Sequence, residues 1–139
     1  DHRDLHSFPT RRSSDLQAIA ARYTQTEVES ICYADAAGNL LATSDAIRAG
    51  TVGRNQIVVT YRDGTVVVVN GNETEKMRVT VGGREVALGP IGYRAWSEGI
   101  EVYSDVEGGR RVNRCTSPRY DYFETEGAKP EVVLKGMKK

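Results

Sequence analysis

Residues 56–70 read QIVVTYRDGTVVVVN and carry the strongest local structural signal in the chain. Two runs of mostly β-branched residues flank Asp63-Gly64, a pair that is typical of two-residue type I′ hairpin turns. We therefore predict a β-hairpin here. The second run is apolar on both faces from Val66 to Val69, which is typical of a strand in the centre of a sheet with both sides covered.

The two-residue turn also predicts how these strands pair. It places Tyr61 opposite Val66 and Val59 opposite Val68, and it requires a positive φ at Gly64. A valine at this glycine position would be strained, because β-branched residues rarely adopt positive φ.

Further turn signals follow along the chain, at Gly82-Gly83, Glu98-Gly99, Gly108-Gly109 and Ser117-Pro118. The first three are typical of hairpins, and the proline of the last cannot donate to a sheet ladder. An apolar patch from Val132 to Leu134 favours an edge strand. Closely spaced turns are typical of an antiparallel sandwich or barrel. We predict a mainly β protein in which residues 51–139 form an antiparallel β-sandwich built from successive hairpins.

The segment 17–50 predicts a short N-terminal helix followed by connector strands. Ile19 and Tyr23 lie four positions apart among alanines, which favours a helix over residues 17–26. Residues 28–35 favour a strand that turns at 36–39 and returns through two leucines.

A second helical signal follows in SDAIRAG, residues 44–50. Either Ser44 or Asp45 could cap the start of this helical turn, and Gly50 would end it.

The first sixteen residues differ in character from the rest of the chain. DHRDLHSFPTRRSSDL has neither the apolar core of a signal peptide nor the acid-poor composition of a transit peptide. At every position the segment resembles the translation of a widely used sequencing-adapter oligonucleotide. We therefore interpret residues 1–16 as artefactual, exclude them from the fold, and expect the natural protein to be longer at its N-terminus.

Composition limits the function classes. The chain has 139 residues with 19 basic and 19 acidic side chains, so no charge excess favours nucleic acid or an anionic membrane. No apolar run approaches the length of a membrane span. Both histidines, His2 and His6, lie in the adapter-like segment. The remaining sequence therefore offers no His-based triad, acid–base pair or metal site.

Carboxylate pairs are the obvious candidates for hydrolytic chemistry. Three occur, at Glu27/Glu29, Asp121/Glu124 and Glu124/Glu126. Alternating acids on a strand are more often a solvated face than a catalytic dyad, and we assign no catalytic, cofactor-binding or metal-binding residue and no cofactor.

Aromatic residues suggest a second possibility, since sugars stack on exposed aromatic rings. Tyr120 and Tyr122 share one strand face, Phe123 lies on the other, and Trp96 precedes a turn. Packing and strand propensity explain these residues better than sugar binding.

Two further features leave alternatives open. Cys32 and Cys115 could form one disulfide in an exported protein or remain two buried thiols, and their spacing matches no zinc or redox motif. Asn72-Glu73-Thr74 is formally a glycosylation sequon, which matters only in a eukaryotic secretory pathway.

The pattern from Gln56 to Trp96 resembles the C-terminal β-domain that follows the catalytic barrel in many glycoside hydrolases. In those domains, a strand, an Asp-Gly turn and a strand ending in Val-Asn precede a Leu-Pro-Pro-x-Gly-like step. Here that step is Leu88-Gly89-Pro90-Ile91-Gly92, with Gly89 in place of one proline.

The resemblance implies a non-catalytic β-sandwich that accompanies an upstream catalytic barrel. The catalytic carboxylates of such families lie in the barrel, so none carries over to this chain. The implied partners are that upstream domain and carbohydrate, without nucleic acid or membrane, and the implied location is extracellular or periplasmic. The alternative is a freestanding carbohydrate-binding or adhesion-type β-module.

Overall fold

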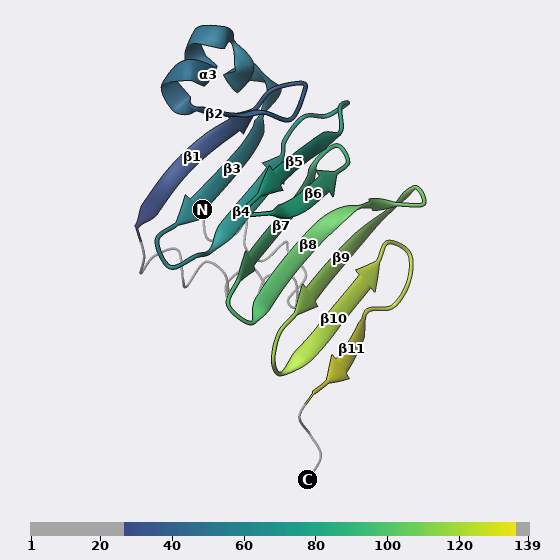
Figure 1. Ribbon diagram of the computed structural model, residues 1–139. Helices are drawn as coiled ribbons and strands as arrows, with labels where there is room; N and C mark the ends of the chain where they lie inside the picture. Colours follow the sequence, from purple (N-terminus) through teal and green to yellow (C-terminus); the bar gives the residue numbers. More distant parts are fainter. Residues whose placement is uncertain (1–26, 136–139) are drawn as a thin grey trace, which may run out of the picture.

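The structure is a computed structural model that describes residues 27–135 (Figure 1). It is mainly β and antiparallel, as predicted. One sheet of nine strands has the order β11-β10-β9-β8-β7-β4-β3-β1-β2, and β5 and β6 form a separate two-stranded sheet. The predicted helix over residues 17–26 and the adapter-like segment lie outside the described residues.

The strands of the large sheet are β1 (Val28–Ala34), β2 (Leu40–Ala42), β3 (Gln56–Tyr61), β4 (Val66–Asn70), β7 (Gly92–Ser97), β8 (Ile100–Glu107), β9 (Arg110–Thr116), β10 (Tyr120–Thr125) and β11 (Glu131–Leu134). The small sheet consists of β5 (Met77–Val81) and β6 (Arg84–Leu88). Between β2 and β3 lie the helix α3 (Thr43–Ala49) and the 3-10 helix η1 (Thr51–Arg54).

The β5–β6 hairpin packs over one face of the large sheet, which gives the protein its sandwich-like layering (Figure 1). Apolar residues alternate with exposed ones along both hairpin strands, so one side of the hairpin is buried and the other faces solvent. The core between the layers consists of Ala34, Val58, Val66, Val68, Met77, Val79, Val86 and Leu88. A second cluster, of Ala95, Val102, Cys115 and Tyr122, lies on the opposite face.

The hairpin turn at Asp63-Gly64 forms, but the predicted register is wrong by one residue. Thr60 pairs with Val66 and Val58 with Val68, rather than Tyr61 with Val66 and Val59 with Val68. The loop holds three residues, because the Tyr61 amide donates to the Thr65 carbonyl (2.8 Å) and the Gly64 amide donates to Tyr61 (3.0 Å).

The side chain of Asp63 explains this longer loop. Its Oδ1 accepts a hydrogen bond from the Thr65 amide at 2.9 Å, which stabilises a type I turn followed by a left-handed residue. Gly64 is that residue, with φ of 94°, so its predicted positive φ is confirmed.

Strand β4 occupies the centre of the sheet, between β3 and β7, as predicted. Its two faces are not equally covered. Val66 and Val68 are buried under the β5–β6 hairpin, whereas Val67 and Val69 on the other face are half-buried. The expectation of a strand covered on both sides is therefore confirmed for one face only.

Helix α3 forms where SDAIRAG predicts a helical turn, and Gly50 ends it with φ of 77°. The predicted cap is wrong. The N-cap is Ala42, and neither Ser44 nor Asp45 makes a capping hydrogen bond. Asp45 instead lies in the first turn and pairs with Arg48 at 3.0 Å.

Candidate functional site

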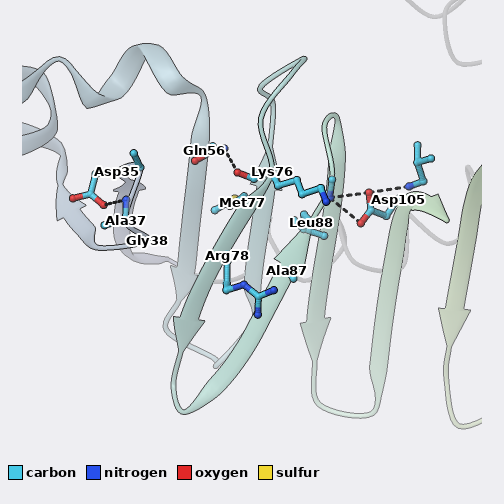
Figure 2. A pocket seen from close by; sticks show the side chains of 13 residues that line it. Asp35, Ala37, Gly38, Gln56, Lys76, Met77, Arg78, Ala87, Leu88 and Asp105 are labelled. Atoms are coloured by element: carbon cyan, nitrogen blue, oxygen red, sulfur yellow. Dashed lines mark hydrogen bonds between the residues drawn. The ribbon is translucent and has the colours of Figure 1, made fainter. Parts of the chain in front are cut away.

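A cavity of about 520 Å³ lies at one end of the β5–β6 hairpin (Figure 2). The loop between β1 and β2, the open end of the hairpin and strand β8 surround it. Its charged lining residues are Asp35, Lys76, Arg78 and Asp105. A cavity of this size falls within the range of small-molecule sites.

Asp35 shapes the loop on one side of the cavity. Its Oδ1 accepts hydrogen bonds from the amides of Ala37 (2.9 Å) and Asn39 (2.8 Å), which fold the chain into a tight turn. The hydrogen bond from the Asn39 amide is the main cause that lowers the pKa of Asp35 below its usual value. This carboxylate is therefore ionised at neutral pH and committed to the turn.

Asp105 forms the opposite wall and is only 6% exposed. Both of its carboxylate oxygens accept from the Gly89 amide at 3.0 Å, and Oδ1 also accepts from the Val106 amide at 2.8 Å. Gly92 packs so close that a Cβ there would lie 2.7 Å from Asp105 Oδ1. Asp105 thus holds the step from β6 into β7.

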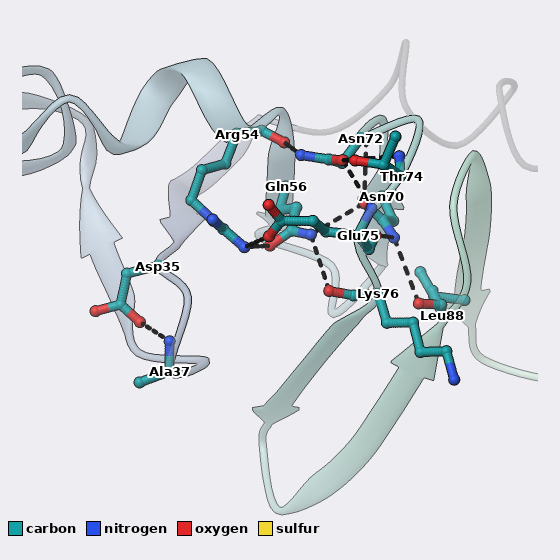
Figure 3. A network of polar contacts seen from close by, with 10 residues as sticks. All are labelled: Asp35, Ala37, Arg54, Gln56, Asn70, Asn72, Thr74, Glu75, Lys76 and Leu88. Carbon is teal, nitrogen blue, oxygen red and sulfur yellow. Dashed lines mark hydrogen bonds and ion pairs between the residues drawn. The ribbon is translucent and has the colours of Figure 1, made fainter.

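A buried polar network centred on Asn70 borders the cavity (Figure 3). Asn70 Nδ2 donates to the carbonyls of Glu75 (2.8 Å) and Gly89 (2.9 Å), which lie on either side of the β5–β6 hairpin. Its Oδ1 accepts from Gln56 Nε2 at 3.2 Å, and Gln56 Nε2 also donates to the Lys76 carbonyl at 3.1 Å. These two amides attach both ends of the hairpin to the sheet.

Asn72, the acceptor residue of the formal sequon, belongs to the same network. Its Oδ1 accepts from the amides of Thr74 (3.0 Å) and Glu75 (2.9 Å), and its Nδ2 donates to the Arg54 carbonyl at 3.2 Å. The side-chain amide is therefore used to fold the loop before β5.

The charges around the cavity have different roles. Arg78 is paired with Glu85 at 2.9 Å. The carboxylates of Asp35 and Asp105 accept hydrogen bonds from backbone amides. Within residues 27–135, the Lys76 ammonium makes no hydrogen bond or ion pair. The arrangement suits the binding of a small polar molecule rather than proton transfer between two positioned acids.

Sequence reasoning missed this site because its residues come from distant segments. Asp35 could have been found from the Asp-x-x-Gly-Asn turn that it opens. Nothing local marks Asn70 or Asp105, whose partners lie across the fold.

The structure places the three carboxylate pairs considered from the sequence in different surroundings. Glu27 pairs with Arg62 at 3.2 Å, and Glu29 is exposed. Asp121 and Glu124 lie on opposite faces of β10, because they are three positions apart on a strand, and Asp121 pairs with Lys135 at 2.8 Å. Glu124 and Glu126 line the same hollow.

The aromatic residues are packed or covered by arginines. Tyr122 is 3% exposed in the second cluster, with Tyr120 packed against it. The guanidinium of Arg84 lies over the Trp96 ring at 4.2 Å, and that of Arg114 lies over the Phe123 ring at 4.9 Å. Such cation–π pairs occupy the faces on which a sugar would stack.

A third pair joins Arg94 to the Tyr103 ring at 4.3 Å. Burial, with the hydrogen bond that Tyr103 donates to Glu107 at 2.7 Å, raises the pKa of Tyr103 to about 12. This phenol stays protonated under physiological conditions and can therefore keep donating to Glu107.

Three remaining sequence features can now be placed. No disulfide joins Cys32 to Cys115, which lie on opposite faces of the sheet, and Cys32 is half-buried. Within residues 27–135, no three His, Cys, Asp or Glu side chains gather into a metal-binding group. No helix in that range is long and apolar enough to cross a membrane.

Comparisons with known proteins assign this chain to no family. No protein-family model, curated protein or solved structure matches this chain.

Proposed function

We propose that this chain is a non-catalytic accessory β-domain from the C-terminal end of a longer glycoside-hydrolase-like protein. In this role the domain packs against an upstream catalytic barrel. The proposal rests on the resemblance of residues 56–96 to such domains and on one surface of the large sheet.

That surface is an apolar stripe on the face opposite the β5–β6 hairpin. It consists of Ile31, Ile57, Val59, Val67 and Val69, which the strand registers place on the same face. Ile31 is 42% exposed, and the other four are half-buried. Contiguous apolar residues that stay partly exposed favour contact with another protein surface. The stripe therefore supports a role in docking rather than in chemistry.

Two measurements test the proposal. In the parent protein, Ile57→Lys should lower the thermal midpoint of the barrel, because it places a charge in the interface, whereas Thr80→Lys on the exposed side of the hairpin should not. Unfolding of the isolated chain carrying each substitution corrects for effects on this domain alone. Equal effects of both substitutions on the barrel would rule out docking through the stripe.

Enzyme assays test the non-catalytic part. We expect no turnover of a panel of aryl glycosides by the chain alone. Turnover that disappears on replacing a single Asp or Glu would overturn this expectation.

The second candidate is a freestanding carbohydrate-binding or adhesion-type module. The cavity beside Asp35 and Asp105 favours it, since charged side chains at the rim of a cavity can hydrogen-bond sugar hydroxyls. Retention of the chain on immobilised polysaccharides, abolished by Lys76→Ala, would favour this candidate over the docking role.

A further inference from the structure

Strand β11 is an open edge of the large sheet. It pairs with β10 on one side, and no strand of the described residues covers its other side (Figure 1). Every residue of β11 is exposed, with Val133 at 58% and Leu134 at 59%. Proteins usually shorten, charge or cover such edges, because their free backbone groups pair readily with another strand. The opposite edge fits that rule, since β2 has three residues and leads directly into α3.

The free hydrogen-bonding groups of this edge belong to Val132 and Leu134. The Lys135 amide donates to the Arg119 carbonyl at 2.8 Å, so the backbone of Lys135 faces β10. Successive residues of a strand direct their amides and carbonyls to opposite sides. The amides and carbonyls of Val132 and Leu134 therefore point away from β10, while those of Val133 point toward it.

The side chains of these two residues are apolar and extend the second cluster. Val132 lies opposite Tyr122 and Leu134 lies opposite Tyr120, and these tyrosines belong to that cluster or pack against it. Residues directly opposite each other on neighbouring strands share a face of the sheet. The second cluster therefore continues to the edge of the sheet, where Val132 and Leu134 remain exposed to solvent.

Charged side chains flank this apolar pair on the other face. Glu131 begins β11, and within residues 27–135 it forms no ion pair. Lys135 follows the strand and pairs with Asp121 of β10 at 2.8 Å. Glu131 and Lys135 share a face because they are four positions apart in extended chain. The edge thus carries a negative charge at its start and a positive charge at its end.

We propose that two copies of this chain dimerise by pairing their β11 strands antiparallel about a two-fold axis at Val133. This register places Val132 opposite Leu134 of the second copy, so that their outward amides and carbonyls form hydrogen bonds in both directions. It also places Glu131 opposite Lys135 of the second copy, and the symmetry repeats this pair. The two large sheets become one continuous sheet, and the second clusters of the two copies meet across the interface.

The neighbouring registers satisfy this edge less well. Because only outward-facing residues can hydrogen-bond across the interface, one strand can slide only in steps of two residues. One such step places Pro130, which has no amide N–H, opposite Leu134 and places Lys129 opposite Lys135. A step the other way separates Glu131 from the opposing lysine. Charge and backbone pairing therefore select the same register.

This interface is independent of the proposed accessory role. The apolar stripe lies on β1, β3 and β4, toward the other end of the strand order, and pairing through β11 leaves it free. One short strand from each copy makes a small interface. We therefore expect a weak dimer, with a Kd of about 10–100 μM.

Sedimentation velocity of the full 139-residue chain at physiological salt, over about 5–500 μM, tests the proposal. We expect a monomer–dimer equilibrium. Glu131→Lys and Lys135→Glu should each weaken dimerisation about tenfold or more, because each turns both attractive pairs into repulsive ones. Glu98→Lys makes the same charge change as Glu131→Lys at an exposed turn. It is the matched control and should leave the Kd within about twofold.

Mixing the two weakened variants tests the register itself. A chain with Glu131→Lys and a chain with Lys135→Glu present opposite charges to each other at both ends of the interface. The mixture should therefore dimerise within about threefold of the unchanged chain. Such recovery separates charge repulsion from a loss of folding.

A chain that stays monomeric up to about 500 μM would overturn the proposal. A dimer that Glu131→Lys leaves unchanged would overturn it too, since its interface would lie on another surface. The same holds for a mixture of the two folded variants that dimerises no better than either alone. If circular dichroism shows that Lys135→Glu does not fold, Glu131→Lys decides, because that side chain is exposed.

Discussion

Among single residues, Asn70 has the most connections in the described fold. It is fully buried, and its side-chain amide makes hydrogen bonds with Gln56 and with both ends of the β5–β6 hairpin. A buried side chain of this kind stabilises a fold mainly because its removal leaves several partners unsatisfied.

We expect Asn70→Ala to lower the free energy of unfolding by about 2–4 kcal/mol, since it removes the donor from the carbonyls of Glu75 and Gly89 and one of the two acceptors of Gln56 Nε2. Urea denaturation measures this change. Asn39→Ala, in the exposed β1–β2 turn, is the control and should cost less than about 1 kcal/mol. Similar costs for both variants would contradict the anchoring role of Asn70.

Gly92 packs tightly at the step between β6 and β7. An added Cβ would lie 2.7 Å from Asp105 Oδ1 and 3.1 Å from the Gly89 carbonyl oxygen, and neither atom is free to move. Gly92→Ala should therefore destabilise the protein by about 1–3 kcal/mol in thermal or urea melts. Gly53→Ala meets no atom within 4 Å and should be neutral or slightly stabilising. A neutral Gly92→Ala would show that this step between β6 and β7 is loosely packed.

At the scale of elements, β4 is the strand on which the two layers meet. Val68 is fully buried, Val67 is half-buried on the other face, and Val106 is 44% exposed on β8. We expect the cost of truncation to alanine to fall in that order, with about 2–3 kcal/mol for Val68 and less than about 1 kcal/mol for Val106. Urea melts of the three variants test this order of costs. If Val106→Ala proved the costliest, β4 would not be central to stability.

The same strand shows how far sequence reasoning reaches. Periodicity and turn residues predicted the hairpins at Gly82-Gly83 and Gly108-Gly109 correctly, because a two-residue glycine turn leaves one register. They failed at Asp63-Gly64, where the Asp63 side chain favours a three-residue loop. They also could not show that β4 pairs with β7, because nothing in the chain marks β5–β6 as a separate layer.

For the candidate site, sequence-based prediction fails for a different reason. The sequence shows the turn that Asp35 opens, but not the roles of Asn70 and Asp105. Their importance comes from burial and from hydrogen bonds to other segments of the chain, and both depend on the finished fold.

For the whole molecule, the adapter-like interpretation of residues 1–16 makes a direct prediction. A segment without a periodic apolar face, and unrelated to the natural sequence, contributes no specific packing. We expect its deletion to leave the thermal midpoint unchanged within error. A drop of several degrees, about the effect of 1 kcal/mol in a domain of this size, would show that the segment packs on the fold.

The strand order has a consequence for how this protein is made. From β7 to β11 each strand pairs with the next one along the chain, and β1 to β4 pair among themselves. Hairpins form in about 1–10 μs, whereas a ribosome adds about 5–20 residues per second. From β2 onward, each strand of the large sheet therefore finds a neighbour already synthesised when it leaves the ribosome. The growing sheet can assemble in the order of translation, with each strand after β2 adding to the edge opposite β2.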